Sequence, residues 1–338
     1  MIKQFMIFVI SLGFYAIPTN AEAGFIFFTD QGNVFRSNLD GSNLIKIMAN
    51  SAINGNAAWL DVDPVNQKIY WRGSPNLVGG SGGVVRRMNF DGSGLEDVVT
   101  DLGFSAFGLA LDLINDRIYF GDHPLGIFYT NLDGSEKTLL PNTSSGFDLL
   151  RHTHDIEVSN DLNKVYYTNG EFPFFNRFDG IRRADLDGNN VEDIAVTNIN
   201  SAITLALDVS AGKLYFAPEK TGTIFRSALD GLGPEPFLTG IDGVYDIEVD
   251  SLAGKIYWTS QFELGRANLD GSGVERLANL SGERFNKGLY VLGDVSVVPE
   301  PSSYALFSVG ILIVGIIGWR KRRIVFESRK AESMVTQA

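Results

Sequence analysis

The stretch Lys255-Ile256-Tyr257-Trp258-Thr259, followed by Asn268-Leu269-Asp270-Gly271-Ser272-Gly273, decides the fold of this chain. The same pattern occurs six times: a short apolar run ends in an aromatic pair, and an Asp-Gly turn follows. The aromatic pairs are Phe27-Phe28, Tyr70-Trp71, Tyr119-Phe120, Tyr166-Tyr167, Tyr215-Phe216 and Tyr257-Trp258. The turns begin at intervals of 51, 42, 54, 43 and 40 residues, at Asp40, Asp91, Asp133, Asp187, Asp230 and Asp270. A period of roughly 40 to 50 residues built from short strands is typical of β-propeller blades.

Each repeat contains further segments with the alternating pattern of a β-strand. One such run precedes every aromatic pair except the first, as in Asp246-Ile247-Glu248-Val249-Asp250. A third run precedes each Asp-Gly and a fourth follows it, as in Leu44-Ile45-Lys46-Ile47. The Asp-Gly supplies the positive φ that a tight hairpin needs. Each repeat is therefore predicted to form a four-stranded antiparallel blade.

The first repeat lacks its leading strand, because the apolar run at Phe25 comes directly after the amino-terminal segment. A matching run, Gly288-Leu289-Tyr290-Val291-Leu292, stands alone at the other end of the repeats. We expect the two terminal strands to share one blade and to close the ring without exposed edges. The sequence thus predicts an all-β fold, a six-bladed β-propeller of 24 strands over residues 24–297.

Residues 1–23 have the pattern of a secretory signal peptide, which signal peptidase would remove. Lys3 provides the positive start, residues 5–17 are apolar, and Ala21-Glu22-Ala23 fits the cleavage site. The alternatives are a buried first strand and an uncleaved anchor.

The other end combines three features in order. Val298-Pro299-Glu300-Pro301 is followed by an apolar segment from Tyr304 to Trp319 and by the basic cluster Arg320-Lys321-Arg322-Arg323. As a helix the 16 apolar residues reach about 24 Å, and snorkelling basic side chains extend this towards the roughly 30 Å of a hydrocarbon core. We expect a C-terminal transmembrane helix with the basic cluster and a short tail, 324–338, in the cytoplasm. Residues 24–297 would then lie outside the cytoplasm.

These features of residues 298–323 resemble the PEP-CTERM sorting signal of Gram-negative, biofilm-forming bacteria. The resemblance implies that an exosortase-type membrane enzyme recognises Pro299, Glu300 and Pro301 and processes the protein for the cell surface. The chain departs from the usual pattern in the additional tail 324–338.

The repeats resemble the six-bladed YWTD propellers of the low-density-lipoprotein-receptor class, over essentially residues 25–292. The matching residues are Lys255 to Thr259, Asn268 to Gly273 and Lys68-Ile69-Tyr70-Trp71. The Thr-Asp half of the motif survives in Thr29-Asp30, with Thr168-Asn169 close to it. The resemblance implies the fold and brings no catalytic residues.

Charge and cysteine content exclude some functions. The chain of 338 residues has a formal net charge of −12, and residues 24–298 hold 21 basic against 36 acidic groups, a net charge of −15. A nucleic-acid partner is not expected, because phosphate binding needs a basic surface. With no cysteine, neither disulfides nor thiolate metal sites can form.

Loop lengths point to a binding face. The spacing from the second aromatic residue to the Asp-Gly is 20 residues in repeats 2 and 4 and 12 to 14 in the others. The repeat 4 insertion brings Phe172, Phe174, Phe175 and Arg177 into one loop, which either packs over the propeller or forms an exposed recognition patch. The long crossing before repeat 4 ends with Arg151, His152 and His154, and we expect it to reach the same face beside that loop.

Two metal sites are conceivable. His152 and His154 with Asp155 and Glu171 have the residue types of a transition-metal site, against ordinary polar residues at a channel mouth. Asp63, Asp112, Asp208 and Asp250 recur at the ends of innermost strands, where they either cap turns or form a calcium-binding carboxylate ring. We predict no cofactor, with Ca²⁺ as the alternative.

The sequence is best interpreted as an exported, surface-associated, non-enzymatic binding or scaffold propeller whose partner is a surface protein or polysaccharide. The alternative is a metal-dependent, lactonase-like hydrolase with its site at the channel mouth. A purely architectural role in extracellular polymer is the third interpretation.

Overall fold

The computed structural model describes residues 24–52, 55–75, 83–103, 108–122, 125–143, 151–171, 180–194, 202–218, 221–282 and 287–293. Ala23–Gly293 form one compact unit. The predicted signal peptide, sorting signal, C-terminal helix and tail lie outside the described residues. Within the described part of the chain, no helix is long and apolar enough to cross a membrane.

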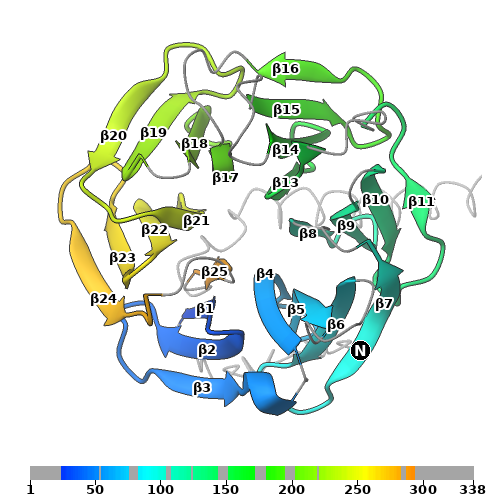
Figure 1. Ribbon diagram of the computed structural model, residues 1–338. Coiled ribbons are helices and arrows are strands. Elements are labelled where there is room, and N and C mark those ends of the chain that lie inside the picture. The colour runs from blue at the N-terminus through cyan, green and yellow to red at the C-terminus, as the bar shows by residue number, and fades with distance from the viewer. Residues whose placement is uncertain are drawn as a thin grey trace, which may run out of the picture. The chain divides into compact units, whose positions relative to one another are not determined.

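The described strands form six sheets arranged around a central axis, which confirms the predicted six-bladed propeller (Figure 1). Blade 1 consists of β25 (Leu289–Leu292), β1 (Phe25–Asp30), β2 (Asn33–Asn38) and β3 (Ile45–Met48). Blade 2 consists of β4 (Gly55–Asp63), β5 (Lys68–Pro75), β6 (Gly83–Asn89) and β7 (Glu96–Leu102). Blade 3 consists of β8 (Leu109–Asp112), β9 (Arg117–Asp122), β10 (Gly126–Asn131) and β11 (Thr138–Leu139).

The remaining blades follow the same plan. Blade 4 consists of β12 (Arg151–His152), β13 (Ile156–Ser159), β14 (Lys164–Glu171), β15 (Gly180–Asp185) and β16 (Glu192–Ile194). Blade 5 consists of β17 (Ala202–Asp208), β18 (Lys213–Pro218), β19 (Thr223–Ala228) and β20 (Glu235–Thr239). Blade 6 consists of β21 (Val244–Asp250), β22 (Lys255–Ser260), β23 (Glu263–Asn268) and β24 (Glu275–Asn279). A short 3₁₀ helix, η1 (Asn50–Ala52), leads from blade 1 to blade 2.

The two ends of the propeller share blade 1, as predicted. Strand β25 pairs antiparallel with β1, with Phe25 opposite Leu292 and Phe28 opposite Leu289. The predicted count of 24 strands is wrong by one among the described residues. The inner position of blade 4 is divided between β12 and β13, which both pair with β14.

The repeated aromatic pairs build the interfaces between blades. All twelve side chains are at most 2% exposed. Because successive residues of a strand point to opposite faces of the sheet, the first aromatic residue of one blade shares a core cluster with the second aromatic residue of the next. The clusters join Phe27 to Trp71, Tyr70 to Phe120, Tyr119 to Tyr167, Tyr166 to Phe216, Tyr215 to Trp258 and Tyr257 to Phe28. Truncating one such residue to alanine typically costs about 3–5 kcal/mol, so these pairs hold the ring together.

The Asp-Gly turns are scaffold. Their six glycines all have positive φ, between 78° and 86°. In blade 6, the Asp270 carboxylate accepts hydrogen bonds from the Ser272 amide at 2.8 Å and the Ser272 hydroxyl at 2.6 Å. The serine hydrogen bonds lower the pKa of Asp270, and the same arrangement lowers that of Asp40, Asp91 and Asp133. These carboxylates therefore stabilise the turns to which they belong.

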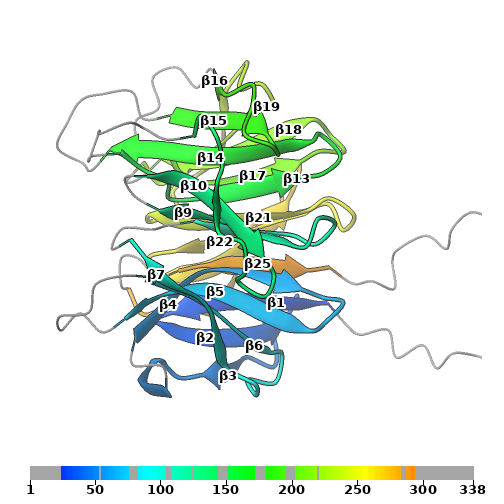
Figure 2. The ribbon, with the colours of Figure 1, turned by 90° about the vertical axis from the view of Figure 1, so that its right-hand side faces the viewer.

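The ring has two distinct faces (Figure 2). The loop face carries the hairpins between the second and third strands of each blade, such as Gln261–Phe262 between β22 and β23. The turn face carries the turns between first and second strands, such as residues 251–254, and the Asp-Gly turns. Since Phe25 lies opposite Leu292 at the end of blade 1 that belongs to the turn face, the first and last strands of the described chain begin and end there.

Candidate functional site

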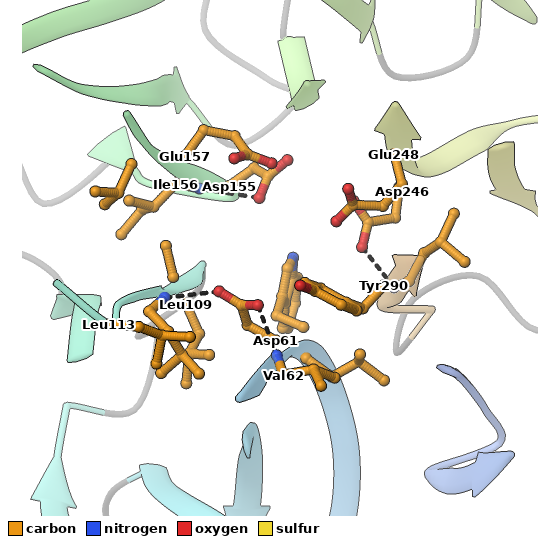
Figure 3. Close-up of a pocket in the computed structure, with 16 residues that line it drawn as sticks. Asp61, Val62, Leu109, Leu113, Asp155, Ile156, Glu157, Asp246, Glu248 and Tyr290 are labelled. Carbon is orange, nitrogen blue, oxygen red and sulfur yellow. Dashed lines mark hydrogen bonds between the residues drawn. The ribbon is translucent and has the colours of Figure 1, made fainter. Parts of the chain in front are cut away.

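The strongest candidate site is a cavity of about 200 Å³ on the axis of the ring, between the innermost strands (Figure 3). Five carboxylates line it, and none of its 16 lining residues is basic. Strands β4, β13 and β21 supply the carboxylates of Asp61, Glu157, Asp246 and Glu248, and Asp155 directly precedes β13. The cavity is therefore strongly acidic.

The strand register explains why carboxylates meet here. One position of the innermost strand lies opposite the first aromatic residue in every blade. From blade 1 to blade 6 it is occupied by Tyr290, Asp61, Ala110, Glu157, Ala206 and Glu248. Acidic residues thus occupy alternate blades, and alanine or tyrosine lies between them.

Three of the carboxylates fasten neighbouring blades to one another. Asp61 accepts a hydrogen bond from the Val62 amide of its own strand and another, at 2.6 Å, from the Leu111 amide of blade 3. Asp155 and Asp246 repeat this arrangement. Asp155 accepts hydrogen bonds from the amides of Ile156 and of Leu205 in blade 5. Asp246 accepts hydrogen bonds from the amides of Ile247 and of Leu289 in blade 1. These aspartates have a structural role and also add negative charge to the cavity.

Glu157 and Glu248 differ from the aspartates. Neither carboxylate has a hydrogen-bond or ion-pair partner among the described residues. Both side chains are enclosed by protein atoms, and both point into the cavity (Figure 3). Each remains partly accessible to a water-sized probe, as residues that line a cavity do. They are the carboxylates free to contact a ligand.

Burial and mutual repulsion raise the pKa values of the cavity's carboxyl groups and so favour their protonated forms. Burial raises the pKa of Asp61 to about 7 and that of Asp155 to about 6, against the lowering effect of their amide hydrogen bonds. Burial, followed by repulsion from neighbouring carboxylates, raises the pKa values of Glu157, Asp246 and Glu248 well above their usual range. Strongly perturbed acids that share a cavity are typical of functional sites, although structural networks also produce them.

Two aromatic side chains complete the wall. Tyr290 from β25 extends its ring into the cavity (Figure 3), and burial raises the pKa of its hydroxyl well above 10.0. Trp59 lies at an irregularity of β4 and has a positive φ of 36°, an uncommon conformation for a bulky residue. The cavity therefore combines anionic groups with aromatic surface.

The predicted aspartates at the strand ends cap turns. Asp63 accepts hydrogen bonds from the amides of Val65 and Asn66 and from the Asn66 side chain. Asp112, Asp208 and Asp250 likewise accept hydrogen bonds from the amides of Asn115, Ala211 and Ala253. The turn-capping interpretation is confirmed, and the carboxylates of the cavity are other residues.

The predicted metal ligands are only partly described. Strand β12 places Arg151 opposite Glu171 and His152 opposite Gly170 at the loop face. The backbone amide of His154 donates to the Thr168 hydroxyl. The side chains of His152 and Glu171 lie outside the described ones, as do Phe172, Phe174, Phe175 and Arg177. No group of three His, Cys, Asp or Glu able to hold a metal ion occurs among the described residues.

The sequence reasoning missed Asp61, Glu157, Asp246 and Glu248 as site residues. Each lies in a strand with the expected alternation, in which a polar residue is typical of the pattern and does not by itself indicate a site. The available signal was the recurrence of an acidic residue at one strand position in alternate repeats, with Ala110 and Ala206 between them.

Comparison with known proteins identifies one motif and supports the fold. Residues 297–323 match the PEP-CTERM protein-sorting motif. The motif implies export, a cell-surface or membrane-associated location, and processing by an exosortase-type enzyme.

Among curated proteins, "Protein cueball" of Drosophila erecta is 26% identical over 144 residues, which cover 41% of this chain and 21% of the relative. The protein of the same name from Drosophila yakuba is 27% identical over 145 residues. The chain therefore matches about a fifth of the length of these relatives.

Solved structures show the same architecture. A chain of the nidogen/laminin complex aligns with a TM-score of 0.66 and 17% identity, over 80% of this chain and 98% of that chain. The calcium-binding protein regucalcin of Agrobacterium tumefaciens aligns with a TM-score of 0.52 and 14% identity, over 65% of this chain and 73% of its own. At these identities the likeness concerns the fold alone.

Proposed function

We propose that this protein is a non-enzymatic binding module of the cell surface, which presents its loop face to a surface protein or polysaccharide. The observation that carries the proposal is that the first and last strands of the propeller reach the same face of the ring. Strand β1 begins and strand β25 ends at the turn face, and the sorting motif begins at residue 297. The eleven residues 293–303 that lead to the apolar segment at Tyr304 reach about 36–40 Å at most when fully extended, so we expect the point of attachment to lie near the turn face.

The loop face then points away from the attachment point. Strands β5 and β14 end there at Pro75 and Glu171, and the two long insertions follow. Rigid scaffolds commonly carry their binding residues on variable loops of this kind. The similar nidogen chain comes from a complex with laminin, which supports protein binding as one mode open to a propeller of this form.

The rival interpretation, a metal-dependent hydrolase, requires several metal ligands that converge at the channel mouth. Asp155, one of the predicted ligands, already accepts amide hydrogen bonds from two blades. This favours the binding module.

Replacement of Phe172, Phe174 and Phe175 by serine is expected to reduce binding of the labelled mature protein to extracellular polymer from the source cells at least fivefold. The matched control is Val65→Ser with Leu252→Ser, two turn-face residues that are 84% and 68% exposed. Binding is measured by co-sedimentation, with circular dichroism to check folding. Loss of binding in the control pair alone, or no binding by the parent protein, would contradict the proposal.

A further inference from the structure

The axial cavity has no positive group to balance its charge. Its five carboxylates come from blades 2, 4 and 6, and its lining contains no Lys, Arg or His. Buried charges are normally paired or coordinated. Three of the carboxylates have amide donors, whereas Glu157 and Glu248 have no partner among the described residues, although both are enclosed and aimed into the cavity (Figure 3). A cation or bound protons must supply the balance.

The arrangement of the carboxylates argues against a bare metal ion. A metal ion requires several ligand atoms that converge on one point, each about 2.0–2.6 Å from the ion. Here the acidic residues lie in blades 2, 4 and 6, and Ala110 of blade 3 and Ala206 of blade 5 occupy the positions between them. No group of three metal-binding side chains forms among the described residues. The negative charge is spread around the cavity wall instead of being focused on one point.

Size and aromatic surface point to an organic cation. At about 200 Å³ the cavity is smaller than the roughly 300–1,000 Å³ of pockets for drug-sized ligands. Tyr290 and Trp59 line the same space. Ammonium groups are attracted to the faces of aromatic rings and form strong charge-assisted hydrogen bonds with carboxylates.

We propose that the axial cavity binds an alkylammonium group, held between the unpartnered carboxylates of Glu157 and Glu248 and against the ring of Tyr290. The group is carried either by a small linear diamine or by a lysine side chain of a peptide. This inference rests on the cavity alone, and it does not depend on the partner proposed for the loop face.

Protonation must weaken this binding. The titratable groups that face the two glutamates, besides each other, are Asp61 of β4, Asp155 directly before β13, Asp246 of β21 and Tyr290 of β25. As the pH falls below the raised pKa values of the acids, the cavity loses negative charge. The affinity for an ammonium group is therefore expected to fall at least tenfold between pH 8 and pH 5.

Isothermal titration calorimetry on the mature protein at pH 8 tests the proposal. The probes are 1,5-diaminopentane, Nα-acetyl-lysine amide and, separately, CaCl₂ at matched ionic strength. We expect saturable binding of at least one ammonium probe, weakened at least tenfold by Glu157→Gln with Glu248→Gln. The matched control, Glu136→Gln with Asp161→Asn, removes two exposed carboxylates with no hydrogen-bond partner among the described residues and should bind like the parent.

The pattern of results separates the sources. Tighter binding of the diamine indicates a free ligand, and tighter binding of the lysine derivative indicates a peptide side chain. No saturable binding of either ammonium probe would overturn the proposal and leave protons as the balancing charge. Equal binding by the Glu157→Gln, Glu248→Gln variant, or binding of Ca²⁺ alone, would overturn it as well.

Discussion

Glu157→Gln combined with Glu248→Gln is expected to raise the free energy of unfolding at pH 8, in the absence of amines, by on the order of 2–4 kcal/mol. Neither carboxylate has a hydrogen bond or ion pair to lose among the described residues. Burial and repulsion from neighbouring acids destabilise the charged form of both groups, with Asp155 first among the repelling groups for Glu157, and Glu157 first for Glu248. Glutamine keeps the shape of each side chain and removes that charge.

The pH dependence follows from the direction of the shifts. An acid whose pKa is raised in the folded state binds more protons folded than unfolded, so stability falls as pH rises through the interval between the two pKa values. For Asp61 the pKa interval extends from the ordinary value of 3.8 to about 7, and for Asp155 from 3.8 to about 6. The parent protein should lose stability from about pH 4 to pH 8, and the double variant should lose less.

Urea denaturation at pH 5, 7 and 8 measures both effects. The Glu136→Gln, Asp161→Asn pair should follow the parent profile, since both residues are exposed. A double variant that is less stable than the parent at pH 8 would show that the glutamates are favourably paired. An unchanged pH profile would show that their pKa values are not raised in the folded state.

Ending the chain at Lys287 instead of Gly293 is expected to abolish the cooperative unfolding transition. The shorter chain lacks β25, and with it the pairing of Phe25 to Phe28 with residues 289–292. Leu289 is 1% exposed and packs with Ile26 and Tyr257, and losing a buried leucine alone typically costs about 2–5 kcal/mol. The exposed edge of β1 also becomes a template for aggregation.

Both chains lack residues 294–338, so the comparison isolates the closing strand. Thermal unfolding followed by circular dichroism and light scattering gives the readout. The chain ending at Gly293 should melt cooperatively, whereas the chain ending at Lys287 should aggregate or unfold without a sharp midpoint. Equal midpoints for the two chains would contradict the role assigned to β25.

Much of the fold could be predicted because the decisive signals are local. Alternation within a strand places Tyr257 and Trp258 on opposite faces of blade 6, and the structure uses one for each interface. The glycine of each Asp-Gly marks a positive φ that other residues rarely adopt. Even the closing strand was visible, since Gly288 to Leu292 is a first strand without a second strand after it.

The cavity could not be predicted in the same way, because its residues meet only after the ring closes. Asp61, Glu157 and Glu248 are separated by 96 and 91 residues. In the sequence each is the polar member of an alternating strand, a pattern equally typical of a solvent-facing side. The division between β12 and β13 was also missed, since no turn signal marks it.

The measurement that tests the central claim most directly is cysteine labelling on intact cells. The chain contains no cysteine, so Phe262→Cys and Leu252→Cys each introduce one reactive thiol. Both residues belong to blade 6 and are 45% and 68% exposed, Phe262 on the loop face and Leu252 on the turn face. The probe is a bulky, membrane-impermeant maleimide, and the purified proteins provide the intrinsic reactivity of each site.

Each labelling rate on cells is divided by the rate of the same purified variant. The ratio is expected to be several-fold higher for Phe262→Cys than for Leu252→Cys, because the loop face points outwards. If neither thiol reacted before lysis, the propeller would not be displayed at the surface. If Leu252→Cys reacted as fast as Phe262→Cys, or faster, the proposed orientation would be wrong.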